Sequence, residues 1–252
     1  MISKSRVSDI RKLHLKKFRD AQQLFLVEGR KCVEMLLQSD YIVEELFATE
    51  SSVEANKQML AKVPVTIATP SEMERLSTLS TSPDLLAVVR KKQESSPLDE
   101  NAPVIVLDRI ADPGNLGTIL RTADWFGIFQ VVCSHDCVDL YNPKTIQSTM
   151  GSFCHVDVRY LDLVDFLSEY GKSHRVLGTF LDGSSVYTFD YQPNDCIVIG
   201  SESHGIRPEI HHLITNKITI PRGTTPRPSA ESLNAGVAAA IVMDHFVSKC
   251  TF

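Results

Sequence analysis

The chain has 252 residues, 43% of them hydrophobic and 23% charged, with a formal net charge of −5, which is typical of a globular protein with one large or two modest domains. No apolar run approaches the roughly 20 residues that cross a bilayer, and the first residues lead into a charged segment, so we expect no membrane span and no secretory signal. The six cysteines are scattered and match no zinc pattern, which favours a reducing, cytoplasmic location and gives no support for a metal site.

Positive charge gathers at the N-terminal end of the chain. Residues 1–92 contain 15 Lys and Arg against 12 Asp and Glu, and residues 1–31 alone contain nine basic side chains against three acidic ones. Such a local excess can hold a phosphate backbone, although a solvated helix face is the commoner reason for this pattern. The candidate RNA-binding residues of this region are Lys12, Lys16, Lys17, Arg19 and Arg30.

The order of apolar runs predicts two domains. Strands are expected at residues 24–27, 41–48, 63–68 and 85–89, separated by helical segments, which indicates a small α/β unit. Residues 91–103 hold two prolines and no apolar pattern, as in an exposed linker. We therefore predict an N-terminal domain over residues 1–92 that binds the RNA substrate, a linker over 93–102 and a second domain over 103–252.

The second domain is predicted to be α/β with a parallel sheet. Its apolar runs are rich in β-branched residues and nearly continuous, at residues 104–107, 130–133, 176–180, 197–199 and 218–220. Runs of this kind suit parallel strands that are buried on both faces, and the stretches between them are long enough for crossover helices.

The first of three informative segments follows the strand at residues 104–107. A Pro113-Gly114 turn leads to Asn115, which is placed to cap a helix, and Arg121 lies six residues further on, about 9 Å along the helix axis. An arginine there points toward the crevice where open α/β sheets bind ligands. A surface arginine paired with Asp124 or another carboxylate is the simpler alternative for this segment alone.

The second segment, Gly200-Ser201-Glu202-Ser203-His204-Gly205, comes directly after another strand. Glycines let the backbone approach a ligand closely, and Glu202 brings a carboxylate to the same sheet edge. The chain contains neither a G-x-G-x-x-G fingerprint nor a G-x-x-x-x-G-K-[ST] loop. No sequence motif therefore supports a dehydrogenase or a P-loop enzyme.

The third segment runs from Ile220-Pro221 through a proline-rich loop to Ser232-Leu233-Asn234 and an alanine-rich stretch. We expect a helix whose first turn offers Ser232 and Asn234 and whose small side chains let another element pack closely. A capped helix in a tight core explains the alanines, but not the gathering of polar side chains and prolines at one strand end.

Taken in this order, the segments resemble the motifs of the SpoU, or TrmH, family of RNA 2′-O-methyltransferases in the SPOUT superfamily. The matching patterns are Asn115-x-Gly117-x-x-x-Arg121, Gly200-x-Glu202-x-x-Gly205, and Ile220-Pro221 with Ser232-Leu233-Asn234. The resemblance extends to residues 142–151 and to Phe25-x-x-Glu28-Gly29. Three departures concern the RNA target: Ser203 where a glycine is usual, Gln147 where an arginine is common, and a loop between residues 221 and 232 about four residues longer.

The resemblance implies a fold, a cofactor and a set of site residues. The second domain is expected to form a deep trefoil knot that binds S-adenosylmethionine without a metal, yielding S-adenosylhomocysteine, in a homodimer that contacts through this domain. The implied cofactor-binding residues are Thr179, Phe180, Leu181, Gly183, Gly200, Ser201, Glu202, Gly205, Ile220, Ser232, Leu233 and Asn234. The implied catalytic residues are Arg121, Asn115, Glu202, Ser232 and Asn234, and Arg121 also contacts the RNA.

Two alternatives stay open at this point. The family proposal makes Arg121 the base for the ribose 2′-hydroxyl, but a guanidinium with a pKa above about 12 is a poor base, so it can instead hold a phosphate and stabilise negative charge. A non-catalytic RNA-binding relative that keeps the fold is the rival function. The sequence does not name the rRNA or tRNA nucleotide that is modified.

Overall fold

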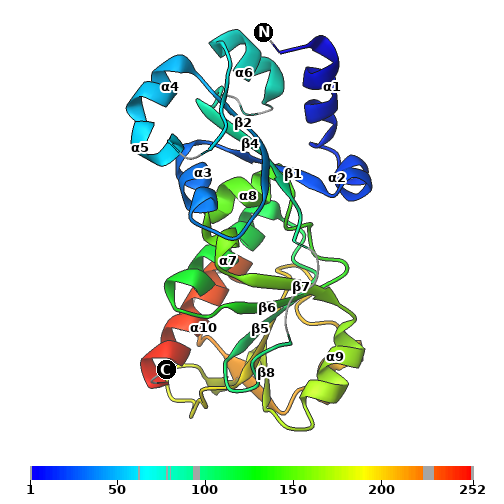
Figure 1. The fold of residues 1–252 in the computed structure, drawn as a ribbon. Helices are drawn as coiled ribbons and strands as arrows, with labels where there is room; N and C mark the ends of the chain where they lie inside the picture. Colours follow the sequence, from blue (N-terminus) through cyan, green and yellow to red (C-terminus); the bar gives the residue numbers. More distant parts are fainter. Residues whose placement is uncertain are drawn as a thin grey trace. The chain divides into compact units, whose positions relative to one another are not determined.

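The computed structural model describes residues 2–61, 63–77, 79, 81–92, 97–223 and 230–250, and the chain divides into two compact units. Unit 1 comprises Met1–Glu94 together with Asp139–Cys154, and unit 2 comprises Ser95–Val138 together with His155–Phe252. Residues 93–96 of the expected linker lie outside the described residues. Figure 1 shows the course of the chain through both units.

Unit 1 is a four-stranded sheet with helices packed against it. The strand order is β1-β4-β2-β3, formed by β1 (Leu24–Glu28), β4 (Leu85–Arg90), β2 (Val43–Ala48) and β3 (Thr66–Ile67). β4 runs antiparallel to β1 and β2, while β3 is parallel to β2. The helices are α1 (Lys4–Lys12), α2 (Lys16–Gln22), α3 (Arg30–Leu37), α4 (Glu50–Ala55), α5 (Lys57–Leu60), α6 (Pro70–Leu76), α8 (Pro143–Thr149) and the short η1 (Ser152–Cys154).

A capping box shows how local sequence sets one of these helices. The Thr69 hydroxyl accepts a hydrogen bond from the Glu72 N–H, and the Glu72 carboxylate accepts one of 2.9 Å from the Thr69 N–H. Pro70 fits the first helical position, where its missing N–H costs nothing. The two backbone donors Thr69 and Ile2 lower the pKa of Glu72 to about 2.

The segment of residues 139–154 packs within unit 1, which its sequence did not indicate. Its aromatic rings contact Phe25, with ring centroids 4.5 Å away at Tyr141 and 6.0 Å away at Phe153. Asp139 also forms an ion pair of 2.7 Å with Arg19. These contacts join α8 and η1 to β1 and α3.

Unit 2 contains a six-stranded sheet in the order β10-β8-β9-β5-β6-β7, and all of its pairings are parallel, which confirms the predicted sheet type. The strands are β5 (Val104–Asp108), β6 (Gln130–Ser134), β7 (Asp157–Leu161), β8 (Val176–Ser185), β9 (Cys196–Gly200) and β10 (Asn216–Thr219). β7 was not predicted, because this edge strand is only half buried and alternates polar with apolar residues.

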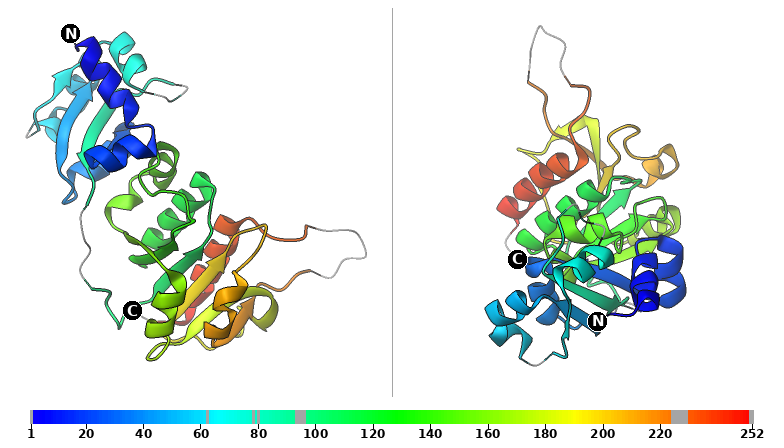
Figure 2. Two further views of the ribbon diagram at one scale, coloured as in Figure 1. Left: turned by 90° about the vertical axis from the view of Figure 1, so that its right-hand side faces the viewer. Right: turned by 90° about the horizontal axis from the view of Figure 1, so that it is seen from above.

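Helices cover both faces of this sheet. α7 (Pro113–Trp125) and α10 (Ala235–Lys249) contact each other, and Figures 1 and 2 draw them side by side. On the other face, α9 (Leu163–Tyr170) and the short η2 (Pro208–Leu213) contribute Leu163, Leu167 and Ile210 to a core cluster with alternate residues of β5 and β9. This layering leaves the carboxyl ends of the strands for the loops that carry the three motifs.

Within the part of the chain that the structure describes, no helix is long and apolar enough to cross a membrane. The six cysteines are buried free thiols. No three His, Cys, Asp or Glu side chains of the described residues come together as a candidate metal site.

Candidate active site

Two loops with candidate catalytic residues leave neighbouring strands at the same edge of the unit 2 sheet. β5 ends at Asp108 and β9 ends at Gly200, and these two residues are partners in the parallel ladder. The loop after β5 leads into α7, while the loop after β9 carries Glu202. Open parallel sheets bind ligands at this carboxyl edge, so the placement suits a binding site.

Asp112, and not Asn115, is the cap of α7. Its carboxylate accepts a hydrogen bond of 2.9 Å from the Asn115 N–H, and Pro113 is the first residue of the helix. The expectation that Asn115 caps the helix was wrong, because a proline favours the first helical position and so places the cap directly before it. The side-chain amide of Asn115 is thereby available for contacts across the site.

Glu202 gathers hydrogen-bond donors from the two other motifs. Its carboxylate accepts hydrogen bonds from the side-chain amide of Asn115 and, at 3.0 Å, from the N–H of Ala235. Asn234 Nδ2 lies 3.5 Å from the same Glu202 oxygen and donates a hydrogen bond of 2.9 Å to Oδ1 of Asn115. An ionised carboxylate only accepts hydrogen bonds, and all three partners are donors. The three motifs therefore meet at one carboxylate.

Glycines shape the turn that carries this carboxylate. A Cβ on Gly200 would lie 2.2 Å from the carbonyl carbon of Gly205, so a side chain does not fit there without moving the backbone. Gly205 has a φ of +62° and donates a hydrogen bond of 2.9 Å to the Ser201 carbonyl. Ser203 and His204 are exposed, with Ser203 Oγ 2.7 Å from His204 Nδ1. The turn therefore accommodates Ser203 at its surface.

An ion pair with a buried carboxylate anchors this turn where it rejoins the sheet. Asp108 is fully buried and accepts hydrogen bonds of 2.7 Å from both the backbone N–H and the Nε of Arg207. The hydrogen bond that Arg207 donates to Asp108 raises the pKa of the Arg207 guanidinium above its ordinary value. Asp136 accepts a further hydrogen bond of 2.9 Å from Arg207 Nη2. The end of β5 and the end of the turn are thus held together at a fixed position.

β8 loses its strand partners over the residues assigned to the cofactor by family resemblance. Its pairing with β9 ends at Gly178, and its pairing with β10 passes from Gly178 directly to Ser184. Among the described residues, the stretch 179–183 therefore has no ladder partner in either neighbouring strand. Unpaired backbone N–H and C=O groups need a partner, and a bound ligand can provide it.

Apolar side chains around this stretch are accessible. Leu181 is 76% exposed and Leu233, which precedes α10, is 45% exposed. Phe180 and Ile220 are half-buried. A strand stretch without ladder partners and accessible apolar side chains in these loops suit S-adenosylmethionine, which has an apolar adenine ring and polar ribose and amino-acid groups.

The third motif is arranged around the start of α10. Asn234 is the N-cap, and its side chain accepts a hydrogen bond of 3.2 Å from the Val237 N–H. The expected helical turn at Ser232 and Asn234 was wrong, because the cap places the first helical residue at Ala235 and leaves Ser232 exposed before the helix. Residues 224–229, and with them most of the loop expected to be longer, lie outside the described residues.

Arg121 is exposed on α7 and is not hydrogen-bonded to the cluster around Glu202 within the described residues. It follows Asn115 by six residues, which is about 9 Å along the axis and on a different side of the helix. Asp124 does not pair with it, since the Asp124 carboxylate contacts His155 Nδ1 at 3.1 Å. The interpretation of Arg121 as a surface arginine paired with Asp124 is therefore wrong.

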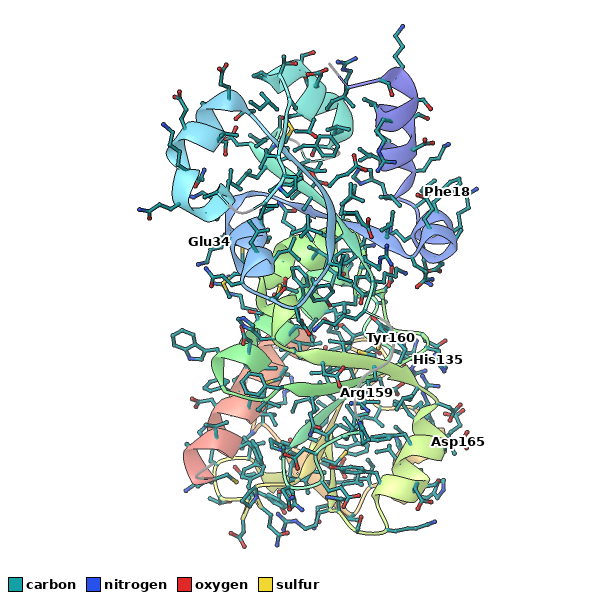
Figure 3. The ribbon with its side chains drawn as sticks, in the orientation of Figure 1. Phe18, Glu34, His135, Arg159, Tyr160 and Asp165 are labelled. Carbon is teal, nitrogen blue, oxygen red and sulfur yellow. The ribbon has the colours of Figure 1, made fainter. Side chains whose placement is uncertain are left out.

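Most of the candidate RNA-binding residues of unit 1 are exposed. Lys12 and Lys16 each form an exposed ion pair with an aspartate of their own helix, at 2.8 and 2.7 Å. The Lys17 ammonium lies 4.8 Å from the centre of the Phe18 ring, which Figure 3 labels. Arg30 is exposed at the start of α3. Exposed pairs of this kind are weak and can be exchanged for phosphate.

Arg19 is the exception and corrects one expectation. Its side chain is 2% exposed and donates hydrogen bonds to Asp139 and to the carbonyls of Leu13 and His14. A guanidinium with these partners stabilises unit 1 and is not offered to RNA. Its position in a basic run gave no sign of burial, because the partner Asp139 lies 120 residues away.

Two arginines at the sheet edge were not singled out by the sequence. Arg207 is one, and the only signal was the position of Asp108 at the end of a buried strand, where a carboxylate requires a partner. Arg109 is the other; its φ of +58° is left-handed, which is strained for a non-glycine residue and is often found at functional sites. Its Nη2 lies 3.5 Å from the Gly205 carbonyl oxygen.

Comparisons with known proteins identify the family of the chain. Residues 102–244 match the SpoU rRNA Methylase family, and residues 4–87 match the MRM3-like substrate binding domain. The chain is similar to the 23S rRNA (guanosine(2553)-2'-O)-methyltransferase RlmP of Bacillus subtilis, with 31% identity over 249 residues that cover 95% of each protein.

Two solved structures are similar over nearly their whole length. One is a Porphyromonas gingivalis protein assigned to the TrmH family of RNA methyltransferases, with 35% identity, a TM-score of 0.85 and 98% of each chain covered. The other is the AdoMet-bound rRNA methyltransferase of Sinorhizobium meliloti, with 25% identity, a TM-score of 0.86 and coverage of 100% of this chain and 97% of that one.

Proposed function

Because the chain belongs to the SpoU rRNA methylase family, whose members are S-adenosylmethionine-dependent RNA methyltransferases, we propose that it methylates a ribose 2′-hydroxyl of structured RNA. The coproduct is S-adenosylhomocysteine. The observation that carries this proposal is the meeting of Asn115, Glu202 and Asn234 at the sheet edge where β8 leaves residues 179–183 unpaired. Ribosomal RNA is the proposed substrate ahead of transfer RNA, since a relative named as a 23S rRNA 2′-O-methyltransferase aligns over 95% of both proteins.

We assign cofactor binding to backbone and side chains of three loops. The first is the unpaired stretch of β8 and the second is the glycine turn after β9. The third joins β10 to α10. The residues assigned to it are Thr179, Phe180, Leu181, Gly183, Gly200, Ser201, Glu202, Gly205, Ile220, Ser232, Leu233 and Asn234. When bound, S-adenosylmethionine supplies an electrophilic methyl group on a positively charged sulfur.

The protein's own contribution is to place the ribose and manage its proton. Much of the rate of a displacement comes from holding the reacting groups in line. The Glu202 carboxylate, with its donors Asn115 and Asn234, keeps the loops at the edge in one arrangement. Ser232 is exposed just before α10, where its hydroxyl can bind substrate. These residues order the site, and none of them needs to change its charge.

Arg121 is assigned to the RNA. An exposed guanidinium can bind a backbone phosphate next to the target ribose and stabilise the negative charge that develops on the 2′-oxygen. In the other version, Arg121 accepts the proton of the 2′-hydroxyl, which requires a site that strongly disfavours its positive charge. The two versions predict different rates for Arg121→Lys.

Unit 1, which contains the matched substrate binding domain, is assigned to RNA recognition. Lys12, Lys16, Lys17 and Arg30 are exposed there and supply positive charge for phosphates. Shape and unpaired loops determine most RNA recognition, so this charge sets affinity more than choice of nucleotide.

The proposal includes a homodimer, a deep trefoil knot around the cofactor site and a cytoplasmic location, as the family resemblance implies. Trp125 on α7 is 84% exposed and Val237 on the adjacent α10 is 49% exposed. Large apolar side chains on neighbouring helices suit a symmetric contact between two copies. Arg121 precedes Trp125 by one helical turn, so such a contact would bring the arginine close to the partner copy.

Methyl transfer with purified components tests the proposed function. The protein is incubated with S-adenosylmethionine labelled in its methyl group and with total RNA from cells that lack it, and the RNA is then digested to nucleosides. We expect label in a 2′-O-methylated nucleoside, and none with Arg121→Ala. Label only in a methylated base would overturn the ribose assignment. Binding of RNA and cofactor without any transfer would support the non-catalytic relative instead.

A further inference from the structure

Asp124 is engaged by an imidazole from a different part of unit 2. His155 Nδ1 lies 3.1 Å from Oδ1 and 3.2 Å from Oδ2 of the Asp124 carboxylate. The side chain of Asp124 is 20% exposed and that of His155 is 41% exposed. An imidazole that carries a proton on Nδ1 donates it to the carboxylate.

Backbone hydrogen bonds connect the segment that follows His155 to the end of α7. Asp157, the first residue of β7, donates a hydrogen bond of 2.8 Å to the Phe129 carbonyl just before β6. Ile128 in turn donates a hydrogen bond of 2.8 Å to the Ala123 carbonyl of α7. The chain carrying the imidazole is thus tied to the end of the helix that carries Asp124.

The two charged residues that follow His155 in β7 are partners of each other. Within β7, the Asp157 carboxylate accepts hydrogen bonds of 2.9 and 2.6 Å from the Nε and Nη2 of Arg159, which Figure 3 labels. Asp157 and Arg159 therefore have an ion-pair partner in each other and do not depend on His155 or Asp124 for one. The remaining basic group one helical turn from Asp124 is Arg121.

Arg121 and Asp124 have the spacing of a helical ion pair and yet do not form one. Oppositely charged side chains three residues apart on a helix are neighbours and ordinarily attract each other. Among the described residues, no ion pair or hydrogen bond engages the Arg121 guanidinium, whereas Asp124 is held by His155. The contact with His155 thereby occupies the one carboxylate that α7 itself offers to Arg121.

We propose that His155 is a positioning residue that retains the Asp124 carboxylate and so keeps Arg121 available to the RNA. This inference rests on the proposed function, since it assumes that Arg121 contacts the substrate. His155 itself touches neither RNA nor cofactor in this account. Its role is to prevent an internal ion pair that would compete with the RNA phosphate for the same guanidinium.

The test compares His155→Ala, Asp124→Asn and the double variant in the labelled methyl-transfer assay with total RNA. In His155→Ala the carboxylate is free to pair with Arg121, and we expect the initial rate to fall about three- to six-fold, the population effect of an exposed ion pair. Asp124→Asn removes the negative charge that could pair with Arg121, so this variant should keep the wild-type rate. The double variant should recover to within about two-fold of wild type, because the competing charge is gone.

A merely structural role of His155 gives a different pattern. The loss in His155→Ala would then persist, or deepen, in the double variant, and this result would overturn the proposal, as would a wild-type rate for His155→Ala. S-adenosylmethionine affinity, measured by calorimetry, should stay within about two-fold in all three variants. Lys172→Ala is the matched control, since it also removes the partner of an exposed carboxylate, Glu169, and should leave the rate unchanged.

Arg121→Ala in the same assay separates this inference from the function on which it rests. If Arg121→Ala transfers methyl groups at the wild-type rate, the role assigned to Arg121 is wrong, and the role proposed for His155 is then wrong as well. If Arg121→Ala is inactive and His155→Ala is not impaired, only the inference about His155 is wrong. Thermal unfolding of each variant identifies any that fails to fold.

Discussion

Asn234 donates a hydrogen bond of 2.9 Å from its side-chain Nδ2 to the side-chain Oδ1 of Asn115, 119 residues earlier in the chain. Both residues lie at the N-terminal end of a helix: Asn115 is in the first turn of α7, and Asn234 caps α10. Their shared partner is Glu202, on the turn after β9. One carboxylate therefore connects the N-terminal ends of two helices.

Removing the Glu202 carboxylate should disconnect the three loops. In Glu202→Ala the donors Asn115 and Ala235 lose their acceptor, and hydrogen bonds to a charged group contribute about 1.5–3 kcal/mol each. We expect methyl transfer to slow by about a hundred-fold, and by about ten-fold in Glu202→Gln, which keeps one acceptor oxygen. Initial rates measure this, with the exposed Glu209→Gln as control. A wild-type rate for Glu202→Ala would show that the cluster is incidental.

Arg121 should matter for turnover more than for cofactor binding. We expect Arg121→Ala to lower the transfer rate by about a hundred-fold or more, with the Kd for S-adenosylmethionine within about two-fold. A guanidinium acts as a base only where its charge is strongly disfavoured, and Arg121 is exposed, so we expect Arg121→Lys to retain appreciable activity. An inactive lysine variant that still binds RNA would favour proton acceptance instead.

The ion pair of Asp108 and Arg207 should be important for stability. Asp108→Asn takes the buried charged acceptor away from the backbone N–H and the guanidinium of Arg207, and hydrogen bonds to a charged group contribute about 1.5–3 kcal/mol each. We therefore expect Asp108→Asn to lower the free energy of unfolding by a few kcal/mol in denaturant titrations. Asp136→Asn is the matched control, because Asp136 contacts the same arginine but is 64% exposed, and its loss should cost about 1 kcal/mol or less. Equal effects of the two changes would contradict this.

Trp125 should control assembly. An aromatic side chain that is 84% exposed is placed for burial against another surface, and we assign that surface to a second copy. Light scattering during size-exclusion chromatography should give twice the monomer mass of 28.1 kDa for the wild type and the monomer mass for Trp125→Glu. Val164→Glu, which alters the exposed side of α9, should leave the dimer intact. A monomeric wild type would rule out the homodimer.

The sequence predicted the unit 2 sheet well, because buried parallel strands are recognisable by their composition. β5, β6 and β9 have apolar centres rich in Val and Ile, and the residues of these centres are all buried. β7 was not predicted because an edge strand needs no apolar run. β3 has only two residues, fewer than the predicted strand over residues 63–68, because little of that segment is buried. The packing of residues 139–154 within unit 1 depends on contacts over more than a hundred residues, which no local pattern contains.

The meeting of the motifs was predictable, but several partners within the site were not. Strand ends of one parallel sheet must share an edge, so Glu202 and Asn115 were expected near each other. Pro113 indicated that Asp112 caps α7, because proline favours the first helical position, but the sequence prediction named Asn115. The pairings of Asp108 with Arg207 and of Arg19 with Asp139 are settled only by the folded chain, since any of many arginines has the right chemistry.

The most direct test of the central claim is a map of ribose 2′-O-methylation across total RNA from cells with and without this protein. We predict that at least one methylated ribose in ribosomal or transfer RNA disappears when the protein is absent. It should return when the wild-type protein is supplied and stay absent when Arg121→Ala is supplied at the same level. An identical map with and without the protein would contradict the proposal that this chain is a ribose methyltransferase.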